Sequence, residues 1–219
     1  MAIPLRDSWL ARALGGEGDD RNSSSSRRGE PNGEAENRSV ASPADGALVE
    51  RLRAGDTAAL TALIASTAPA LTRYAARLLR DAAEADDVVQ EVLARLWARR
   101  ETLAVATTVR AYLFGAVRNA ALNVRKHRRI VGAYAAEETG VQSPVQMGPA
   151  DTVLSRLTVD QLLAHLPERR REAVVLRYLG ELSYAEIATL LGTTRVNAER
   201  LVARSLEALR EIVAAGGKF

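Results

Sequence analysis

The sequence contains no cysteine, which excludes disulfide bonds, thiolate metal sites and cysteine nucleophiles. Its two histidines, His127 and His165, lie far apart in the chain, so a histidine-rich metal site is not expected. Aromatic residues make up only 4% of the chain. No apolar run is long enough to span a bilayer, and no signal-peptide pattern opens the sequence. We therefore expect a cytoplasmic protein that uses neither a metal nor another cofactor.

The residues that are abundant favour helices. Ala, Leu, Arg and Glu predominate, and a hydrophobic fraction of 47% in 219 residues suffices for one or two cores. Residues 15–46 are rich in Gly, Ser, Asn and charge, and they cannot bury enough apolar surface to offset the entropy of ordering. The predicted fold class is all-α, with a disordered N-terminal extension over residues 1–46.

Helical periodicity runs through residues 47–131 and again through 151–214. Between these blocks, residues 132–150 lose the periodicity and gain Gly and Pro, which is typical of a flexible linker. Within the first block, Pro69 and the Arg80-Asp81 pair are expected to separate helices. The sequence therefore predicts two small helical domains joined by a linker.

Charge is distributed unevenly along the first block. Residues 81–94 contain acidic side chains and no Lys or Arg, whereas residues 102–136 contain basic side chains and no Asp or Glu. The net charge of +3 is modest and says little about partners by itself. An acidic segment next to a basic one predicts two different partners for one domain.

The acidic segment has the pattern of an amphipathic helix over residues 84–99. Its apolar residues form one continuous stripe: Val88, Val89, Val92, Leu93, Leu96 and Trp97. Asp87, Gln90, Glu91 and Ala94 fall on the opposite side. This polar side is either a solvated face or a docking surface for a basic helical partner, and the composition of the helix does not decide between them.

The basic segment, residues 108–129, has a stripe of its own: Val109, Tyr112, Leu113, Ala116, Val117, Ala120 and Val124. The other face presents Arg110, Phe114, Arg118 and Arg125, and the run 125–129 adds further positive charge. Arginine neutralises phosphate, and a ring can stack on an unpaired base, so this face favours contact with nucleic acid. The alternative is a basic helix end with Phe114 packed under a neighbouring loop.

The second block contains the pattern of a helix-turn-helix. Ser183 and Glu186 have the spacing of a capping box, Gly192 follows as a tight turn, and Thr193 or Thr194 caps the next helix. Such a unit places its second helix in the major groove of DNA, although a helical hairpin with a Gly turn can also be mere packing. The polar residues available to contact DNA are Thr194, Arg195, Asn197, Glu199, Arg200 and Arg204.

Together these segments resemble bacterial RNA polymerase sigma factors of the extracytoplasmic-function (ECF) subfamily, across residues 47–131 and 151–213. Residues 81–97 resemble the polymerase-binding helix of that family, and residues 110–123 its promoter-melting and −10 recognition helix. Residues 166–178 and the helix-turn-helix resemble its −35 recognition domain. The resemblance implies a region 2 helical bundle, a flexible linker and a region 4 helix-turn-helix.

The resemblance also implies roles for individual residues. The polymerase β′ clamp helices would be contacted by Asp86, Asp87, Gln90 and Glu91. The −10 element would be contacted by Arg110, Tyr112, Phe114, Arg118, Asn119 and Arg125, with the loop 99–108 capturing a flipped base. The region 4 domain would contact the −35 element and the β flap. Members of this group are held inactive by an anti-sigma factor, which is therefore an expected partner.

Two features depart from the family pattern. Glu199 and Leu201 stand where many members carry basic residues, so the −35 sequence is not implied, and residues 1–46 have no counterpart. A helix-turn-helix regulator that acts without polymerase would explain residues 166–213 but would leave the acidic helix without a purpose. An enzyme is not expected, because the sequence has no P-loop, no dinucleotide fingerprint and no nucleophile–base motif.

Overall fold

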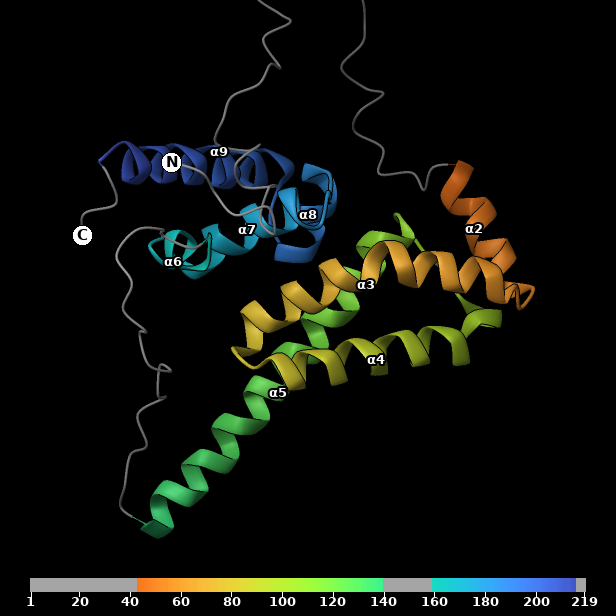
Figure 1. The fold of residues 1–219 in the computed structure, drawn as a ribbon, viewed down its shortest axis with the longest axis horizontal. Helices are drawn as coiled ribbons and strands as arrows, with labels where there is room; N and C mark the ends of the chain where they lie inside the picture. Colours follow the sequence, from red (N-terminus) through yellow and green to blue (C-terminus); the bar gives the residue numbers. More distant parts are fainter. Residues whose placement is uncertain (1–42, 140–158, 216–219) are drawn as a thin grey trace, which may run out of the picture. The chain divides into compact units, whose positions relative to one another are not determined.

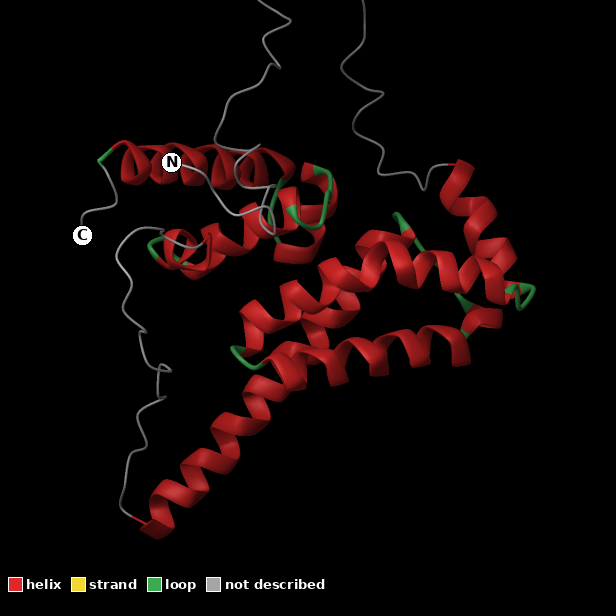
Figure 2. Cartoon of the chain, in the orientation of Figure 1, coloured by secondary structure: helices red, strands yellow, loops and turns green. Residues whose placement is uncertain are grey.

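The structure is a computed structural model that describes residues 43–139 and 159–215, apart from the side chains of 131–139. In this part of the chain every regular element is a helix and no strand occurs (Figure 1 and Figure 2). The all-α prediction is confirmed. Most of the expected N-terminal extension, and residues 140–150 of the expected linker, lie outside the described residues.

The elements follow one another in a simple order. They are α2 (Pro43–Arg53), α3 (Thr57–Leu79), α4 (Ala82–Ala98), the 3-10 helix η3 (Arg100–Thr102), α5 (Val109–Thr139), α6 (Val159–Ala164), α7 (Glu168–Tyr178), α8 (Tyr184–Leu191) and α9 (Arg195–Ala214).

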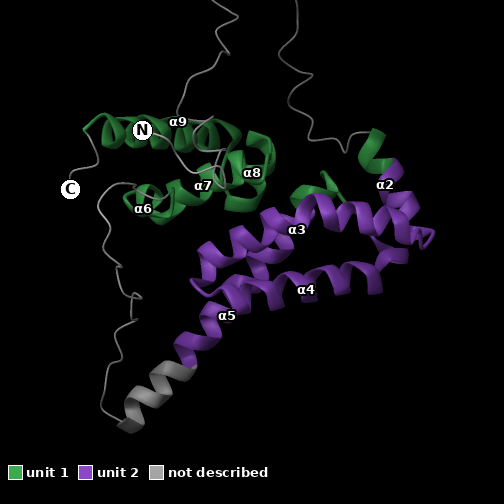
Figure 3. Cartoon of the chain, viewed as in Figure 1, with its two compact units in different colours: residues 1–46, 105–111, 156–219 green, residues 47–104, 112–155 purple. Residues whose placement is uncertain are grey.

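The chain divides into two compact units, shown in different colours in Figure 3. The described parts of unit 1 are residues 43–46, 105–111 and 159–215, and those of unit 2 are residues 47–104 and 112–139. The start of α5 thus belongs to unit 1, whereas the sequence places it in the first domain.

Helices α3 and α4 of unit 2 pack against each other as a hairpin (Figure 1). The turn between them lies at the predicted break. Arg80 ends α3 in a left-handed conformation with a φ of 58°, and its N–H donates to the carbonyl of Ala76. The Asp81 side chain then accepts a hydrogen bond of 3.0 Å from the Glu84 N–H, which caps α4. The break predicted at Arg80-Asp81 is confirmed.

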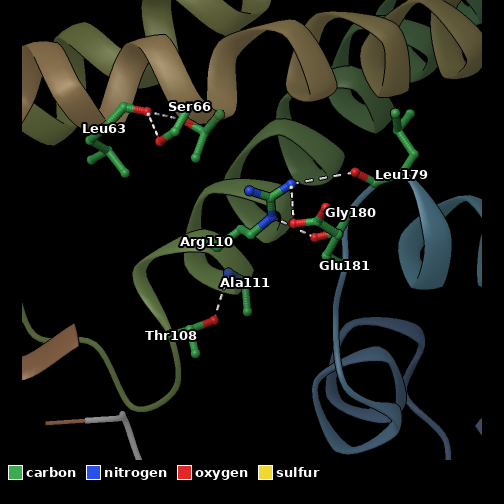
Figure 4. Close-up of polar contacts among 9 residues, drawn as sticks. Leu63, Ser66, Thr108, Arg110, Ala111, Leu179, Gly180 and Glu181 are labelled. Carbon is green, nitrogen blue, oxygen red and sulfur yellow. Dashed lines mark hydrogen bonds and ion pairs between the residues drawn. The ribbon is translucent and has the colours of Figure 1, made fainter. Parts of the chain in front are cut away.

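The break predicted at Pro69 is wrong, because Pro69 lies inside α3. A proline in a helix removes one backbone hydrogen bond and costs about 3 kcal/mol. In the preceding turn the hydroxyls of Ser66 and Thr67 donate to the carbonyl of Leu63, at 3.0 and 2.6 Å (Figure 4). Beyond the proline, Leu71 is fully buried. Burial of the apolar face of α3 therefore outweighs the local preference of proline for a helix end.

Helix α5 is longer than the sequence predicts. It continues to Thr139, whereas the linker was expected to begin at residue 132. Gly132 costs about 1 kcal/mol in a helix interior, but Ala and Glu, which occupy most of residues 133–138, are good helix formers. The loss of apolar periodicity at residue 132 therefore does not mark the end of the helix.

The core of unit 1 is formed by α7, α8 and α9. Leu176 of α7, Ile187 of α8 and Leu209 of α9 are each fully buried. Helix α6 adds Leu162 and Leu163 to the buried side chains. This arrangement holds α9 by one face and leaves its opposite face exposed.

Candidate nucleic-acid interface

The polar side of α4 is exposed as its helical pattern predicts. Val88, Val89, Val92 and Leu96 are buried at 5% exposure or less, and the residues on the other side are exposed: Asp86, Asp87, Gln90 and Glu91. Glu91 forms an ion pair with Arg95 one turn later. Among the described residues, Asp86 and Asp87 have no ion-pair partner. The centre of this surface therefore carries uncompensated negative charge.

Arg128 shows that part of the basic run stabilises the fold. Its guanidinium donates to the Leu79 carbonyl at 3.2 Å, forms an ion pair with Glu84 and lies 3.6 Å from the Asp81 carboxylate. These contacts join α5 to the turn between α3 and α4. The sequence suggested phosphate contacts for the whole run 125–129, and the structure engages Arg128 with carboxylates instead.

Phe114 is buried, so the expectation that it lies on the exposed face of α5 is wrong and the alternative of a packed ring holds. It is fully buried, and its ring centroid lies 5.3 Å from that of Tyr74 in α3. Tyr112, which the sequence placed in the buried stripe, is 39% exposed. Both residues flank Leu113 by 100° on the helical wheel, so periodicity around Leu113 fits either one. The position of α3 decides that Phe114 is buried and Tyr112 is exposed.

Arg110 lies at the start of α5 and is engaged within unit 1 (Figure 4). Its Nε donates to the Gly180 carbonyl at 2.6 Å, and its side chain lies 3.3 Å from the Glu181 carboxylate. The side chain is 25% exposed. The helix start itself is capped by Thr108, whose Oγ1 accepts from the Ala111 N–H at 3.1 Å. A phosphate or base that binds Arg110 must therefore replace protein oxygens.

The other predicted −10 residues differ in exposure. Asn119 is exposed, whereas Arg118 and Arg125 are half-buried and make contacts within the protein. The loop 99–108 is held at its centre, because Leu103 is buried and its carbonyl accepts two hydrogen bonds from Arg53, at 2.6 and 3.0 Å. Tyr112 and Asn119 are thus the side chains of this set that α5 presents to solvent.

The predicted helix-turn-helix is present in unit 1. Ser183 and Glu186 form the complete capping box of α8, and Gly192 ends that helix with a φ of 59°. Of the two threonines considered, Thr194 is the cap of α9, since its side chain accepts from the Asn197 N–H. These local devices set where α9 begins, and hence which of its residues occupy the first exposed turn.

The residues predicted to contact DNA from α9 are placed on its surface. Arg195 is half-buried and makes contacts within the protein, and the others are exposed: Thr194, Asn197, Glu199, Arg200 and Arg204. The sequence reasoning missed Val196, which is 62% exposed in the same first turn. The helical period of the sequence could have identified it, because the buried positions Ala198, Val202 and Leu209 place residue 196 on the opposite side of the helix.

Two kinds of site are absent from the described ranges. Across residues 43–130 and 159–215 there is no group of three or more His, Asp or Glu side chains placed to hold a metal ion. No helix in the described part of the chain is long and apolar enough to cross a membrane.

Comparison with known proteins points to one family. Residues 63–130 match the model of sigma-70 region 2, and residues 156–209 match that of sigma-70 region 4. The ECF RNA polymerase sigma factor SigL of Mycobacterium tuberculosis is 33% identical over 168 residues, which cover 75% of this chain and 94% of SigL. The sigma factor CarQ of Myxococcus xanthus is 32% identical over 166 residues, covering 75% of this chain and 95% of CarQ.

Two solved structures also match the fold of this chain. The sigma factor RpoE of Bartonella quintana, solved in complex with the anti-sigma factor NepR, matches with a TM-score of 0.52 and 25% identity, over 70% of this chain and 96% of that one. CnrH, solved with the cytosolic domain of CnrY, shares the fold with a TM-score of 0.55 and 23% identity, over 78% of this chain and 98% of that one.

The two matched regions, in this order, define a protein of the sigma-70 class. Within that class, the chain belongs to the ECF RNA polymerase sigma factors. It is a sigma factor that binds core RNA polymerase and directs promoter-specific initiation of transcription.

Proposed function

We propose that this sigma factor divides its work among three surfaces. The exposed side of α4, formed by Asp86, Asp87, Gln90 and Glu91 and called here the acidic surface, docks on the β′ clamp helices of the polymerase. The exposed side of α5 contacts the −10 element, and that of α9 contacts the −35 element. The observation that carries the proposal is the uncompensated charge of Asp86 and Asp87 on a helix whose opposite side is buried.

The acidic surface is suited to a basic protein partner for a physical reason. Two adjacent carboxylates without a counter-ion attract a basic surface over several ångströms, and a fixed helix presents them without further ordering. Arg128 neutralises the first turn of α4 through Glu84, so the attraction is centred on Asp86 and Asp87. Complementary charge of this kind raises the association rate and selects the partner.

For the −10 element, Tyr112 takes the part that the sequence gave to Phe114. An exposed ring can stack on an unpaired base. Asn119, about two turns further along the same side of α5, can hydrogen-bond to a base edge. Arg110, Arg118 and Arg125 supply positive charge along the same helix. For the −35 element, the first three turns of α9 present Asn197, Glu199, Arg200 and Arg204.

The docking proposal is tested with Asp87→Lys in the full chain, in a pull-down of purified bacterial core polymerase. We expect at least about a tenfold loss of affinity, because a like charge placed at a complementary interface costs more than about 1.4 kcal/mol. The matched control is Glu101→Lys, which makes the same charge change on an exposed side chain of η3 in the same unit. Unfolding curves verify that both variants fold.

If Asp87→Lys binds polymerase as well as wild type does, the acidic surface is not the docking site. If the wild-type chain itself fails to bind polymerase but binds promoter duplex tightly alone, the protein acts as a helix-turn-helix regulator without polymerase docking.

We further propose that the chain works in the cytoplasm by binding alone, without a catalytic step, and that an anti-sigma factor holds it inactive. Support comes from the RpoE structure, whose partner there is an anti-sigma factor. The test is recovery of the tagged chain from its own cells, with identification of any protein that co-purifies and blocks the polymerase pull-down. Recovery of free chain that is fully active in transcription would count against anti-sigma control.

A further inference from the structure

We propose that Val196 contacts the C5 methyl group of a thymine in the −35 element, and so selects a T·A pair close to the pairs contacted by Glu199 and Arg200. This inference rests on the proposed function of α9 as the −35 recognition helix.

The side chain of Val196 is exposed although it is apolar. At 62% it is the most exposed large hydrophobic side chain in the described part of the protein. The buried side of α9 is made by Ala198, Val202, Ser205, Leu206 and Leu209, and Val196 is outside that set. Valine is also a poorer helix former than alanine, so neither packing nor helix propensity accounts for an exposed valine here.

Val196 lies in the first turn of α9. Thr194 is the cap, so Val196 is the second helical residue. In a helix-turn-helix the N-terminal residues of the second helix are those that contact base edges. Val196 therefore stands where a side chain meets bases and not where it meets the phosphate backbone.

The major groove offers one kind of apolar partner to the Val196 side chain. The base edges in the major groove carry hydrogen-bond donors and acceptors, and their one apolar group is the thymine methyl. An aliphatic side chain that faces these edges gains free energy only against that methyl. Val196 thus implies thymine, whereas the neighbouring Glu199 suits the cytosine amino group and Arg200 suits guanine.

The spacing of Val196, Glu199 and Arg200 along α9 predicts where the thymine lies. Val196, Glu199 and Arg200 lie at i, i+3 and i+4 and share one face of α9, with Cβ atoms about 5–6 Å apart. Base pairs are stacked about 3.4 Å apart along the duplex. The selected thymine should therefore lie within about two base pairs of a C·G or G·C pair that Glu199 or Arg200 contacts.

The experiment uses the complete holoenzyme on a promoter selected from a library randomised in the −35 element. Each thymine of the selected element is replaced in turn by deoxyuridine, which removes only the C5 methyl, and binding is measured by titration. For wild type we expect deoxyuridine to lower the binding affinity about fourfold at one position, because one methyl group is removed from an apolar contact. Val196→Ala should bind thymine and deoxyuridine equally at that position.

Two variants serve as controls. Val213→Ala truncates another exposed valine of α9, far from its N-terminus, and should keep the wild-type preference for thymine. Val196→Ile keeps an aliphatic group at the same position and should also keep it. Because Val196 is exposed, none of these changes should lower the unfolding temperature.

The outcomes separate this inference from the proposed function. If Val196→Ala discriminates thymine from deoxyuridine as wild type does, or if wild type never discriminates, Val196 does not contact a methyl, although −35 recognition stands. If randomising the −35 element leaves holoenzyme binding unchanged, the proposed role of α9 fails, and this inference fails with it.

Discussion

At the scale of single residues, the core of unit 2 contains the aromatic pair Tyr74 and Phe114. The rings of Tyr74 and Phe114 lie 5.3 Å apart with 47° between their planes, and both side chains are almost completely buried. Tilted pairs of this kind add stabilisation beyond the burial of apolar surface. Tyr112, two residues before Phe114, makes no comparable contribution because its side chain is partly in solvent.

We therefore predict opposite phenotypes for two neighbouring aromatic substitutions. Phe114→Ala should lower the free energy of unfolding by about 3–5 kcal/mol, since it leaves a cavity beside Tyr74. Tyr112→Ala should change it by less than about 1 kcal/mol but should reduce promoter melting by the holoenzyme. Denaturant titration measures the first effect, and permanganate reactivity of unpaired thymines measures the second. Equal destabilisation by both would contradict the assignment of faces on α5.

At the scale of elements, the turns and caps determine where each helix begins. Gly180 lies in the turn between α7 and α8, and a Cβ placed there would lie 2.5 Å from the carbonyl oxygen of Leu176. That oxygen is backbone and cannot move away without disturbing α7. By contrast, a Cβ at Gly46 in α2 would meet nothing within 4 Å.

Gly180→Ala should accordingly cost about 1–3 kcal/mol, as overpacking in a fixed environment does. The same substitution at Gly46 should be neutral or stabilising by up to about 1 kcal/mol, because alanine is the better helix former. Thermal unfolding of the two variants provides the comparison. A Gly180→Ala protein as stable as wild type would mean that this turn relaxes freely.

The cap of α3 introduces a dependence on pH. The pKa of Asp56 is lowered from 3.8, chiefly because its carboxylate accepts a hydrogen bond from the Ala59 N–H and then because it pairs with Arg51. Since the folded pKa lies below the unfolded one, this stabilisation is fully present above the unfolded value and is lost as the pH falls through the folded pKa.

Asp56→Asn keeps an acceptor for the cap but removes the titration. We expect the variant to lose less stability than wild type when the pH is lowered from about 5 to about 2. Unfolding curves recorded across that range test this. An unchanged pH dependence would show that the Asp56 carboxylate is equally protonated in the folded and unfolded chain.

At the scale of the whole molecule, we propose that the opposite charges of two segments serve different partners. The acidic segment 81–94 and the basic segment 102–136 both contribute to unit 2, and Arg128 joins them through Glu84. The acidic segment opposes the attraction of the basic segment to DNA phosphates. Specific promoter binding should therefore depend on the polymerase.

We predict that the isolated chain binds promoter duplex weakly and that the holoenzyme binds it specifically. In the holoenzyme, Arg204→Ala should weaken binding to all promoters alike and reduce the slope of log K against log salt by about 1, if Arg204 contacts a phosphate. Binding titrations at several salt concentrations measure both quantities. A change in base preference instead would mean that Arg204 contacts a base edge.

Local chemistry made several features predictable from the sequence by itself. The capping box of Ser183 and Glu186, the left-handed turn at Gly192 and the break at Arg80-Asp81 depend on residues that are neighbours in the chain, so short-range pattern suffices for them. The exposed side of α4 follows from its helical period in the same way. The family resemblance rested on residues 81–97 and the helix-turn-helix, and also on residues 110–123 and 166–178.

Other features were decided only by the tertiary structure, because they depend on what lies beside a helix. Periodicity around Leu113 fits burial of Tyr112 or of Phe114, and the place of α3 selects Phe114. The continuation of α3 through Pro69 comes from burial of the apolar face around it, which outweighs a local cost. The sequence shows Arg128 only as one of several basic residues. In the structure it stabilises the fold, because its side chain donates hydrogen bonds to Glu84 and to the Leu79 carbonyl, more than forty positions away. A helical period specifies a direction around an axis, and only packing specifies which direction faces the core.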